Sequence, residues 1–167
     1  MEEPEEATIV GTYESSALEW PKGTGDMFPA SMLVDGLALD GIWIEKDGKW
    51  TEGCASTHGK GIQWFSLELE TTRYVTKVQI AKRMDSCCRK QGQKISITIG
   101  SSKGHDPNDP LCLPEIPELK HEAGLVDYVC NPGQEGKFVT ISSPEHYMTL
   151  CEVKVFVVHA QTSTVNP

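Results

Sequence analysis

The chain has 167 residues and a formal net charge of −9. This length predicts a single globular domain, and the acidic balance argues against the basic surface that nucleic-acid binding requires. No apolar run approaches the ~20 residues that a membrane-spanning helix needs. We therefore expect neither a nucleic-acid partner nor insertion into a membrane.

Composition divides the chain into three zones. Residues 1–7 are acidic and have no apolar stretch, so we expect a disordered tail that is not a signal peptide. Residues 8–158 carry the apolar patterns of a domain. Residues 159–167 are polar, which is typical of a tail or of a linker to another domain. If the protein is secreted, we expect its signal peptide to precede this chain.

The apolar pattern within the domain has a period of two. A short helix is expected first, at residues 30–34. Five strands then show alternation between apolar and polar residues, at residues 64–69, 75–80, 95–99, 138–142 and 153–157. Many short strands separated by Gly and Pro residues predict an all-β sandwich or jelly roll. The long loops at 36–63 and 101–129 would lie at its ends, where binding sites are common.

The cysteines indicate an oxidising compartment. There are six of them, with no C-x-x-C pair and no His at zinc-ligand spacing. Six cysteines in a chain of this size predict a disulfide framework and therefore a secreted, extracellular protein. The alternative is a set of buried free thiols in a cytosolic protein, and the sequence leaves the pairing open.

No catalytic constellation stands out in the sequence. There is no phosphate-binding P-loop and no H-E-x-x-H pair. Nothing pairs a nucleophile with a base, and spacing along the chain does not single out a glycosidase pair among the many acidic residues. We therefore expect a binding protein and not an enzyme.

One cluster suits a specific ligand. Residues 83–90 (RMDSCCRK) hold three cations, one carboxylate and two adjacent cysteines. A disulfide between adjacent cysteines would be a rigid, flat and slightly apolar platform. Arg83 offers a fork of donors to vicinal hydroxyls, and Asp85 could hold that fork in place. The cluster therefore suits a polyol with one apolar edge; the alternative is a solvated loop with each cysteine bridged elsewhere.

Several stretches resemble motifs of the fucolectin (F-type lectin) family, in the family's order and spacing. Residues 30–36 (ASMLVDG) resemble A-x-N-A-V-D-G, and residues 63–69 (QWFSLEL) resemble W-W-x-V-D-L. Residues 74–78 (YVTKV) and then 83–88 resemble Y-x-V-T-x-V and R-G-D-C-C. Residues 136–141 (GKFVTI) and 147–153 (YMTLCEV) resemble G-R-Y-V-S-I and Y-L-T-L-C-E-V. The resemblance covers residues 8–157 and extends more weakly to the discoidin-like domains of coagulation factors.

The resemblance implies an eight-stranded β-sandwich jelly roll. It also implies three disulfides, which are Cys54–Cys151, Cys87–Cys88 and Cys112–Cys130. A structural calcium ion would be held by the side chains of Asp35 and Glu152 and by backbone carbonyls of Met32, Leu37, Gly53 and Cys151. This mixture suits calcium, which takes 6–8 oxygen ligands. The alternatives are an ordinary turn residue for Asp35 and a solvent-facing strand residue for Glu152.

The resemblance also implies an L-fucose site. Its polar residues would be His58, Arg83, Asp85 and Lys90, with the Cys87–Cys88 bridge packed against the sugar ring. Trp50 would shield the methyl group, and Trp43 and Phe28 are the other aromatic candidates. Two spacings depart from the family pattern. Ser86 is an extra residue, so counting from the cysteines puts Gln91 in the last basic slot. The histidine slot falls on Ser56, and His58, two residues on, would face the same side of an extended segment.

These inferences support a secreted, calcium-dependent lectin that binds fucosylated glycans in cell or pathogen recognition. One alternative is an adhesion or recognition module of the same fold that binds another sugar or a protein. Another is a carbohydrate-targeting domain or repeat of a larger enzyme or of a gamete or cell-surface adhesin. A single lectin site binds weakly, so we expect homo-oligomers or tandem repeats.

Overall fold

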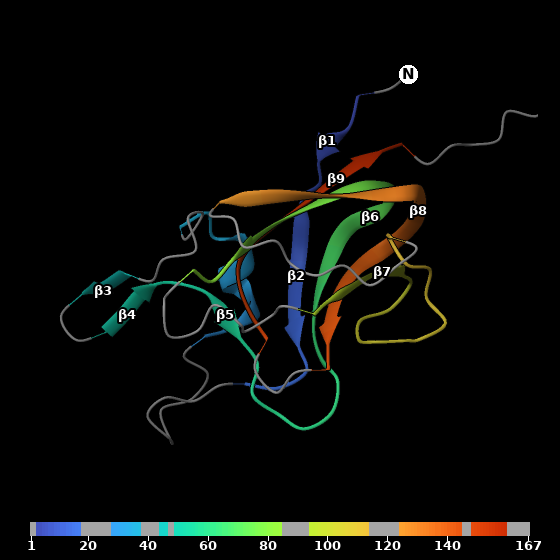
Figure 1. Cartoon of the computed structure of the whole chain (residues 1–167). Helices are drawn as coiled ribbons and strands as arrows, with labels where there is room; N and C mark the ends of the chain where they lie inside the picture. The colour runs from blue at the N-terminus through green and yellow to red at the C-terminus, as the bar shows by residue number, and fades with distance from the viewer. Residues whose placement is uncertain are drawn as a thin grey trace, which may run out of the picture.

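The fold is almost entirely antiparallel β-sheet (Figure 1). A computed structural model describes residues 3–17, 28–37, 44–46, 49–84, 94–113, 124–144 and 148–159, with only the backbone of 44–46 and 49–52. Its elements are β1 (Glu5–Glu6), β2 (Ile9–Glu14), the short 3-10 helix η1 (Ala30–Val34), β3 (Ile44–Lys46), β4 (Lys49–Glu52), β5 (Ala55–Ser56), β6 (Gln63–Lys82), β7 (Ser96–Gly100), β8 (Leu125–Ser143) and β9 (Thr149–Val158). In this part of the chain, no helix is long and apolar enough to cross a membrane.

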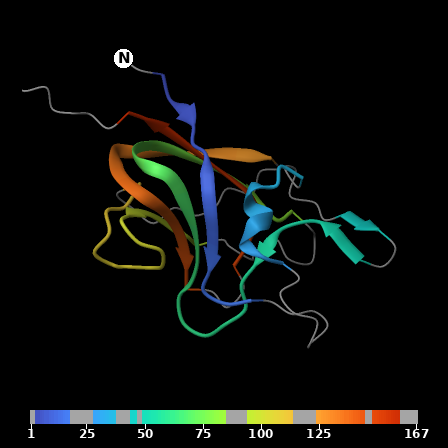
Figure 2. The ribbon, with the colours of Figure 1, turned by 180° about the vertical axis from the view of Figure 1, so that it is seen from behind.

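Two long, bent strands build both layers of the sandwich. The first half of β6 lies between β2 and the second half of β8, which in turn pairs with β7. The second half of β6 lies between β9 and the first half of β8, and β1 and β5 pair with the outer edge of β9. Figures 1 and 2 show β6 and β8 curving together from one layer into the other. The layers are therefore one hydrogen-bonded sheet folded over at these bends.

Alternating residues of the strands fill the space between the layers. Phe65, Leu67 and Leu69 of β6 are at most 1% exposed, as are Ile97 and Ile99 of β7. Successive residues of a strand face opposite sides of the sheet, so the residues between them lie on the other face, where Ser66 and Thr98 are also buried. Full burial of each such side chain contributes about 1.5–3 kcal/mol. The period-two pattern therefore marks the core faces correctly.

The expected β-sandwich is confirmed, and all five expected strands and the short helix are present. The division into strands differs from expectation. Nine strands occur in the described residues, because short edge strands add to the count and because residues 64–69 and 75–80 belong to the single strand β6. The expected loop 36–63 contains β3, β4 and β5, and β8 begins inside the expected loop 101–129.

The acidic N-terminus is partly ordered, contrary to the expectation of a disordered tail. Glu5 and Glu6 form β1 and pair with Val157 and Phe156 of β9. Their side chains also form ion pairs, Glu5 with Arg73 and Glu6 with Lys154. A segment without apolar residues is therefore held by backbone pairing and complementary charge. Residues 160–167 of the expected C-terminal tail lie outside the described part of the chain.

Two of the three expected disulfides are confirmed. Cys54 is bonded to Cys151, and Cys112 is bonded to Cys130. The expected Cys87–Cys88 bridge lies outside the described residues. Structural disulfides form and persist in oxidising compartments such as the extracellular space.

Candidate functional site

The first residues of β9 bring together two segments that are distant in sequence. Ala55 of β5 and Lys82 of β6 both pair with Leu150, from opposite sides of β9. Neighbouring strands lie 4.7–4.9 Å apart, so these two residues are about 10 Å apart. His58 follows Ala55 by three residues, and Arg83 directly follows Lys82. The fold therefore places the expected histidine and the first expected arginine on either side of the start of β9.

The structure distinguishes His58 from Ser56, which the spacing of the family motif places in the histidine slot. Ser56 is 2% exposed, and its hydroxyl lies 2.9 Å from Thr149 Oγ1. His58 is exposed, and its backbone N–H donates to Ser16 Oγ at 3.0 Å. The expectation that the two residues face the same side is wrong, because β5 ends at Ser56. Only His58 can reach a ligand from solvent.

The other expected sugar-binding residues divide into three groups. Asp85, Cys87, Cys88 and Lys90 lie outside the described residues, as do Ser86, Gln91 and Trp43. Trp50 lies in β4, of which only the backbone is described. Phe28 is 3% exposed and packs with Cys54, Ala81 and Cys151. The expectation for Phe28 is therefore wrong, because it belongs to the core and has no surface to offer a ligand.

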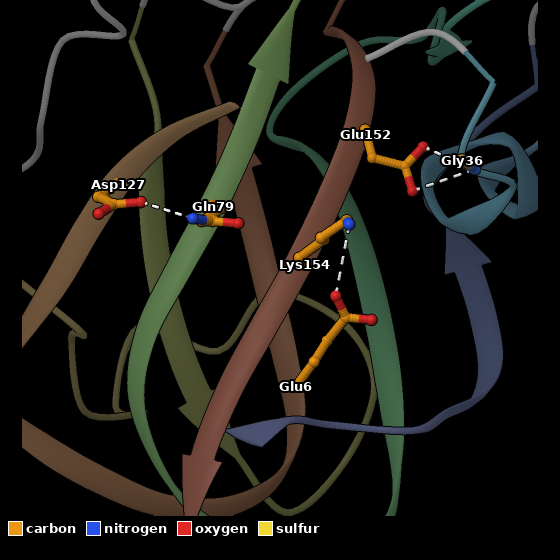
Figure 3. Close-up of polar contacts among 6 residues, drawn as sticks. All are labelled: Glu6, Gly36, Gln79, Asp127, Glu152 and Lys154. Atoms are coloured by element: carbon orange, nitrogen blue, oxygen red, sulfur yellow. Dashed lines mark hydrogen bonds and ion pairs between the residues drawn. The ribbon is translucent and has the colours of Figure 1, made fainter. Parts of the chain in front are cut away.

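A second cluster forms where η1 meets β9. The helix buries Ala30 and Leu33 and ends at Asp35. Gly36 has a φ of +72°, a left-handed conformation that favours glycine. The Asp35 carboxylate accepts the Leu37 N–H at 3.0 Å and so closes the turn. This turn directs the N–H of Gly36 at the Glu152 carboxylate, which accepts it at 3.0 and 3.2 Å (Figure 3).

Glu152 is only 3% exposed, although its side chain is ionisable. The pKa of Glu152 is raised from 4.5 to about 7, mainly by burial and also by the charge of Asp35, against the hydrogen bond from Gly36 and the charge of Lys154, which lower it. Lys154 itself lies 3.5 Å from Glu6. Glu152 is therefore a buried carboxylate beside a second one, an arrangement that a bound cation would stabilise.

The residues present fit the expected calcium ion. Asp35 and Glu152 come together although they are distant in the sequence, and the Cys54–Cys151 bridge brings Gly53 and Cys151 to the same part of β9. Met32 and Leu37 lie on η1 and on the turn that follows it. No group of three or more His, Cys, Asp and Glu side chains in the described ranges is placed to hold a metal ion. The expected set needs only two carboxylates, because backbone carbonyls supply the other oxygens.

One short run has the letters of a serine-hydrolase motif. Residues 100–104 read G-S-S-K-G and match G-x-S-x-G. A nucleophile elbow needs a strand, a sharp turn and a helix in succession. Here β7 ends at Gly100, and no helix follows within residues 101–113. The Gly104 N–H donates to Ser66 Oγ at 2.9 Å, so this loop packs across the sheet. These residues do not form a nucleophile elbow.

The chain is similar to known proteins in sequence and in fold. No family model matches the sequence. The pentraxin fusion protein of Xenopus laevis is 30% identical over 134 residues, which is 79% of this chain and 30% of that protein. The chain thus spans less than a third of that relative's length.

Two solved structures have a similar fold. A fucolectin from striped bass (Morone saxatilis) serum superposes with a TM-score of 0.64 at 23% identity, over 90% of this chain and 46% of that one. A fucose-binding module of Streptococcus pneumoniae has a TM-score of 0.61 at 20% identity, over 89% and 93%. These structures confirm the β-sandwich fold and the resemblance to fucolectins.

Proposed function

We propose that this chain is a calcium-dependent carbohydrate-binding domain that recognises terminal L-fucose on glycans. The observation that carries the proposal is the placement of exposed His58 and of Arg83 on either side of the first residues of β9. A fucolectin and a fucose-binding module share the fold.

The two side chains suit a monosaccharide. The Arg83 guanidinium is a planar fork of donors, which matches two hydroxyls on adjacent ring carbons. The His58 imidazole can donate or accept a hydrogen bond, so it can bind a hydroxyl or the ring oxygen. Both residues follow segments that flank β9 and lie about 10 Å apart at Ala55 and Lys82, so a sugar ring beyond the start of β9 would contact both. The predicted Cys87–Cys88 platform and Trp50 would cover the apolar parts of the ring, while Asp85 and Lys90 would add polar contacts.

Calcium has a structural role in this proposal. It would be held by the carboxylates of Asp35 and Glu152 and by carbonyls of Met32, Leu37, Gly53 and Cys151. When bound, it supplies the positive charge that the buried Glu152 carboxylate lacks. Asp35 directly follows η1 and Glu152 belongs to β9, so the ion would fasten the helix to the strand whose first residues lie between the segments leading to His58 and Arg83.

We place this activity outside the cell. The two disulfides support that setting. The partial match to a longer fusion protein supports a domain of a larger recognition protein. Several copies, in an oligomer or in tandem, would raise the avidity for a glycan surface without any new contact.

Calorimetric titration with L-fucose tests the proposal. We expect saturable binding in calcium, weaker binding in excess chelator, and a loss of at least about tenfold in Arg83→Ala, since a hydrogen bond from a charged group contributes about 1.5–3 kcal/mol. The matched control is Arg73→Ala, because Arg73 pairs with Glu5 at the remote bend of β6. Absence of fucose binding in a folded, calcium-stabilised protein would refute the fucose assignment.

A drifted specificity is the second candidate. It is favoured by Ser56, which occupies the histidine slot by spacing and is buried away from any ligand. His58 would then contact the ligand from a position two residues later in the chain. This difference would reshape the pocket for another sugar or for a protein ligand. A glycan array separates these outcomes, because a fucose site responds to fucosylated glycans and a drifted site does not.

A further inference from the structure

Strand β7 ends near the bend shared by β6 and β8 (Figure 1). Residues from these strands and from the loop after β7 line a cleft. Its volume is about 400 Å³, within the ~300–1,000 Å³ that is usual for small-molecule sites. Thr72 lines it, and ten residues of β6 separate Thr72 from Lys82. At about 3.3 Å for each residue, the two ends of that segment lie roughly 30 Å apart along the strand. The cleft is therefore separate from the proposed fucose site.

Asp109 is fixed at the wall of this cleft by a tight turn. The Asp109 N–H donates to the Asp106 carbonyl at 3.1 Å, and the N–H of Asn108 donates to Asp106 Oδ1 at 2.9 Å. The next residue, Pro110, accepts the Ile99 N–H at 3.0 Å and ties the turn to β7. The backbone position of Asp109 is therefore set before any ligand arrives.

A glycine makes room for that carboxylate. A Cβ atom built on Gly100 would overlap the Asp109 carboxylate, far inside van der Waals contact. Any side chain at position 100 would thus displace the carboxylate from the cleft. Burial raises the pKa of Asp109, and the neighbouring charge of Asp106 raises it further, while the charge of His105 lowers it. Loss of hydration thus outweighs the charge of His105 at this carboxylate.

A second carboxylate, that of Glu135, lines the same cleft from β8. Within the described residues, no hydrogen bond or ion pair satisfies the side chain of Asp109 or of Glu135. Lys137 also lines the cleft, and its ammonium lies 3.2 Å from Glu68 Oε2. Ser101 and Thr72 add hydroxyls, and Pro110 adds an apolar edge. The cleft thus offers two unsatisfied acceptors, donors and one apolar surface.

We propose that this cleft is a second saccharide-binding site. Its carboxylates accept hydrogen bonds from ligand hydroxyls, while Lys137 and the Ser101 and Thr72 hydroxyls donate to ligand oxygens. A neutral, hydroxyl-rich ring supplies donors and acceptors together and has an apolar face for Pro110. A metal ion would face the like charge of the Lys137 ammonium and would leave the hydroxyl donors unused. The proposal does not depend on fucose recognition at Arg83.

Two sites at opposite ends of one domain would let a single chain bridge two glycans, or two positions on one branched glycan. Such bridging raises avidity without oligomerisation, provided that the ligand spans the distance. It would thus give a single domain the multivalency that weak sugar sites require.

The test is an amide NMR titration of the whole chain with L-fucose, D-galactose, D-mannose and N-acetyl-D-glucosamine, followed by short oligosaccharides of these sugars. We expect saturable shifts at Gly100, Ser101 and Gly136 with at least one saccharide. Asp109→Asn combined with Glu135→Gln should weaken that binding by at least about tenfold. The isosteric pair keeps the packing against Gly100. Thr72→Trp, at an exposed position, should fill the cleft and abolish the same shifts.

Controls separate this proposal from the fucose site. Asp127→Asn removes an exposed carboxylate that pairs with Lys77 on the other layer, and it should leave the shifts unchanged. Arg83→Ala should abolish shifts around His58 and leave those around Gly100 intact. Shifts at Gly100 without any at His58 would support the cleft and count against the fucose site. The proposal is overturned if the whole series of sugars leaves Gly100, Ser101 and Gly136 unmoved. It is also overturned if only a cationic probe such as lysine methyl ester moves them.

Discussion

The substitution Glu152→Gln tests the proposed calcium site, because opposite effects are expected with and without calcium. Glu152 is 3% exposed, and burial raises its pKa from 4.5 to about 7. Above that pH, the ionised carboxylate therefore costs the folded protein roughly 3 kcal/mol relative to the unfolded chain, at about 1.4 kcal/mol for each pKa unit. Glutamine removes this charge and keeps an oxygen that can accept the Gly36 N–H.

The sign of the pH dependence follows from the direction of the pKa shift. Because the pKa of Glu152 is raised in the folded state, its contribution to stability is complete below about pH 4.5 and is lost as the pH rises through about 7. In a chelator, the wild-type protein should lose on the order of 3 kcal/mol relative to Glu152→Gln over this interval. Calcium at a thousandfold excess over its Kd should reverse the order above about pH 7, since such an excess stabilises by about 4.1 kcal/mol.

Urea unfolding of both proteins, at several pH values between about 5 and 8 and with chelator or millimolar calcium, measures these differences. Asp127→Asn serves as the control, because an exposed carboxylate should change stability by no more than about 0.5 kcal/mol. The reasoning fails if Glu152→Gln is less stable than the wild type in chelator at about pH 8. It also fails if calcium stabilises both proteins equally, since Glu152 would then not be a ligand.

Three further substitutions examine the fold and the sugar site. His58→Ala should weaken fucose binding at least about tenfold in a calorimetric titration. Ser56→Ala should leave the fucose affinity unchanged and should lower the free energy of unfolding by about 1 kcal/mol. Equal losses of affinity in both would show that Ser56 contributes to the site. Replacing Cys54 and Cys151 together with Ala opens a bridge of sequence separation 97 and should cost about 4–5 kcal/mol by chain entropy, measured by urea unfolding. Phe65→Ala should cost about 3–5 kcal/mol, since Phe65 is fully buried; a loss below about 1 kcal/mol would contradict its place in the core.

The sequence predicts the strands well where apolar and polar residues alternate. Residues 95–99 alternate strictly, and the apolar members Ile95, Ile97 and Ile99 are buried in the structure. The pattern does not show that residues 64–69 and 75–80 form one strand. Glu70, Thr71 and Thr72 between them are exposed, so they have the composition of a loop although the backbone stays extended through the bend.

The calcium site lies beyond what sequence patterns can show. Asp35 and Glu152 are separated by most of the chain, and each alone has the appearance of an ordinary turn or strand residue. Only the resemblance to fucolectins pointed to the pair, and the structure adds the burial of Glu152 and its contact with Gly36. No motif connects Asp109 and Glu135 either. They line one cleft because β7, which precedes the turn at Asp109, pairs with β8, which carries Glu135.

The start of β9 links the two proposed ligands, and this link predicts how strongly they are coupled. Glu152 and Cys151 belong to the calcium set, while Leu150 lies between the strands that carry His58 and Arg83. Without calcium, η1 should loosen from β9, yet the Cys54–Cys151 bridge still holds the segment before β5 against that strand. Chelation should therefore weaken fucose binding only partly in the wild-type protein.

That argument leads to a double perturbation. In the variant with Cys54 and Cys151 replaced by Ala, the bridge is absent, so calcium is the remaining link that ties η1 and the segment before β5 to β9. We expect the fold loss of fucose affinity on chelation to be several times larger in this variant than in the wild type, measured by titration at a temperature where both remain folded. An equal loss in the two proteins would mean that calcium acts on the sugar site by a route that does not pass through β5 and β9.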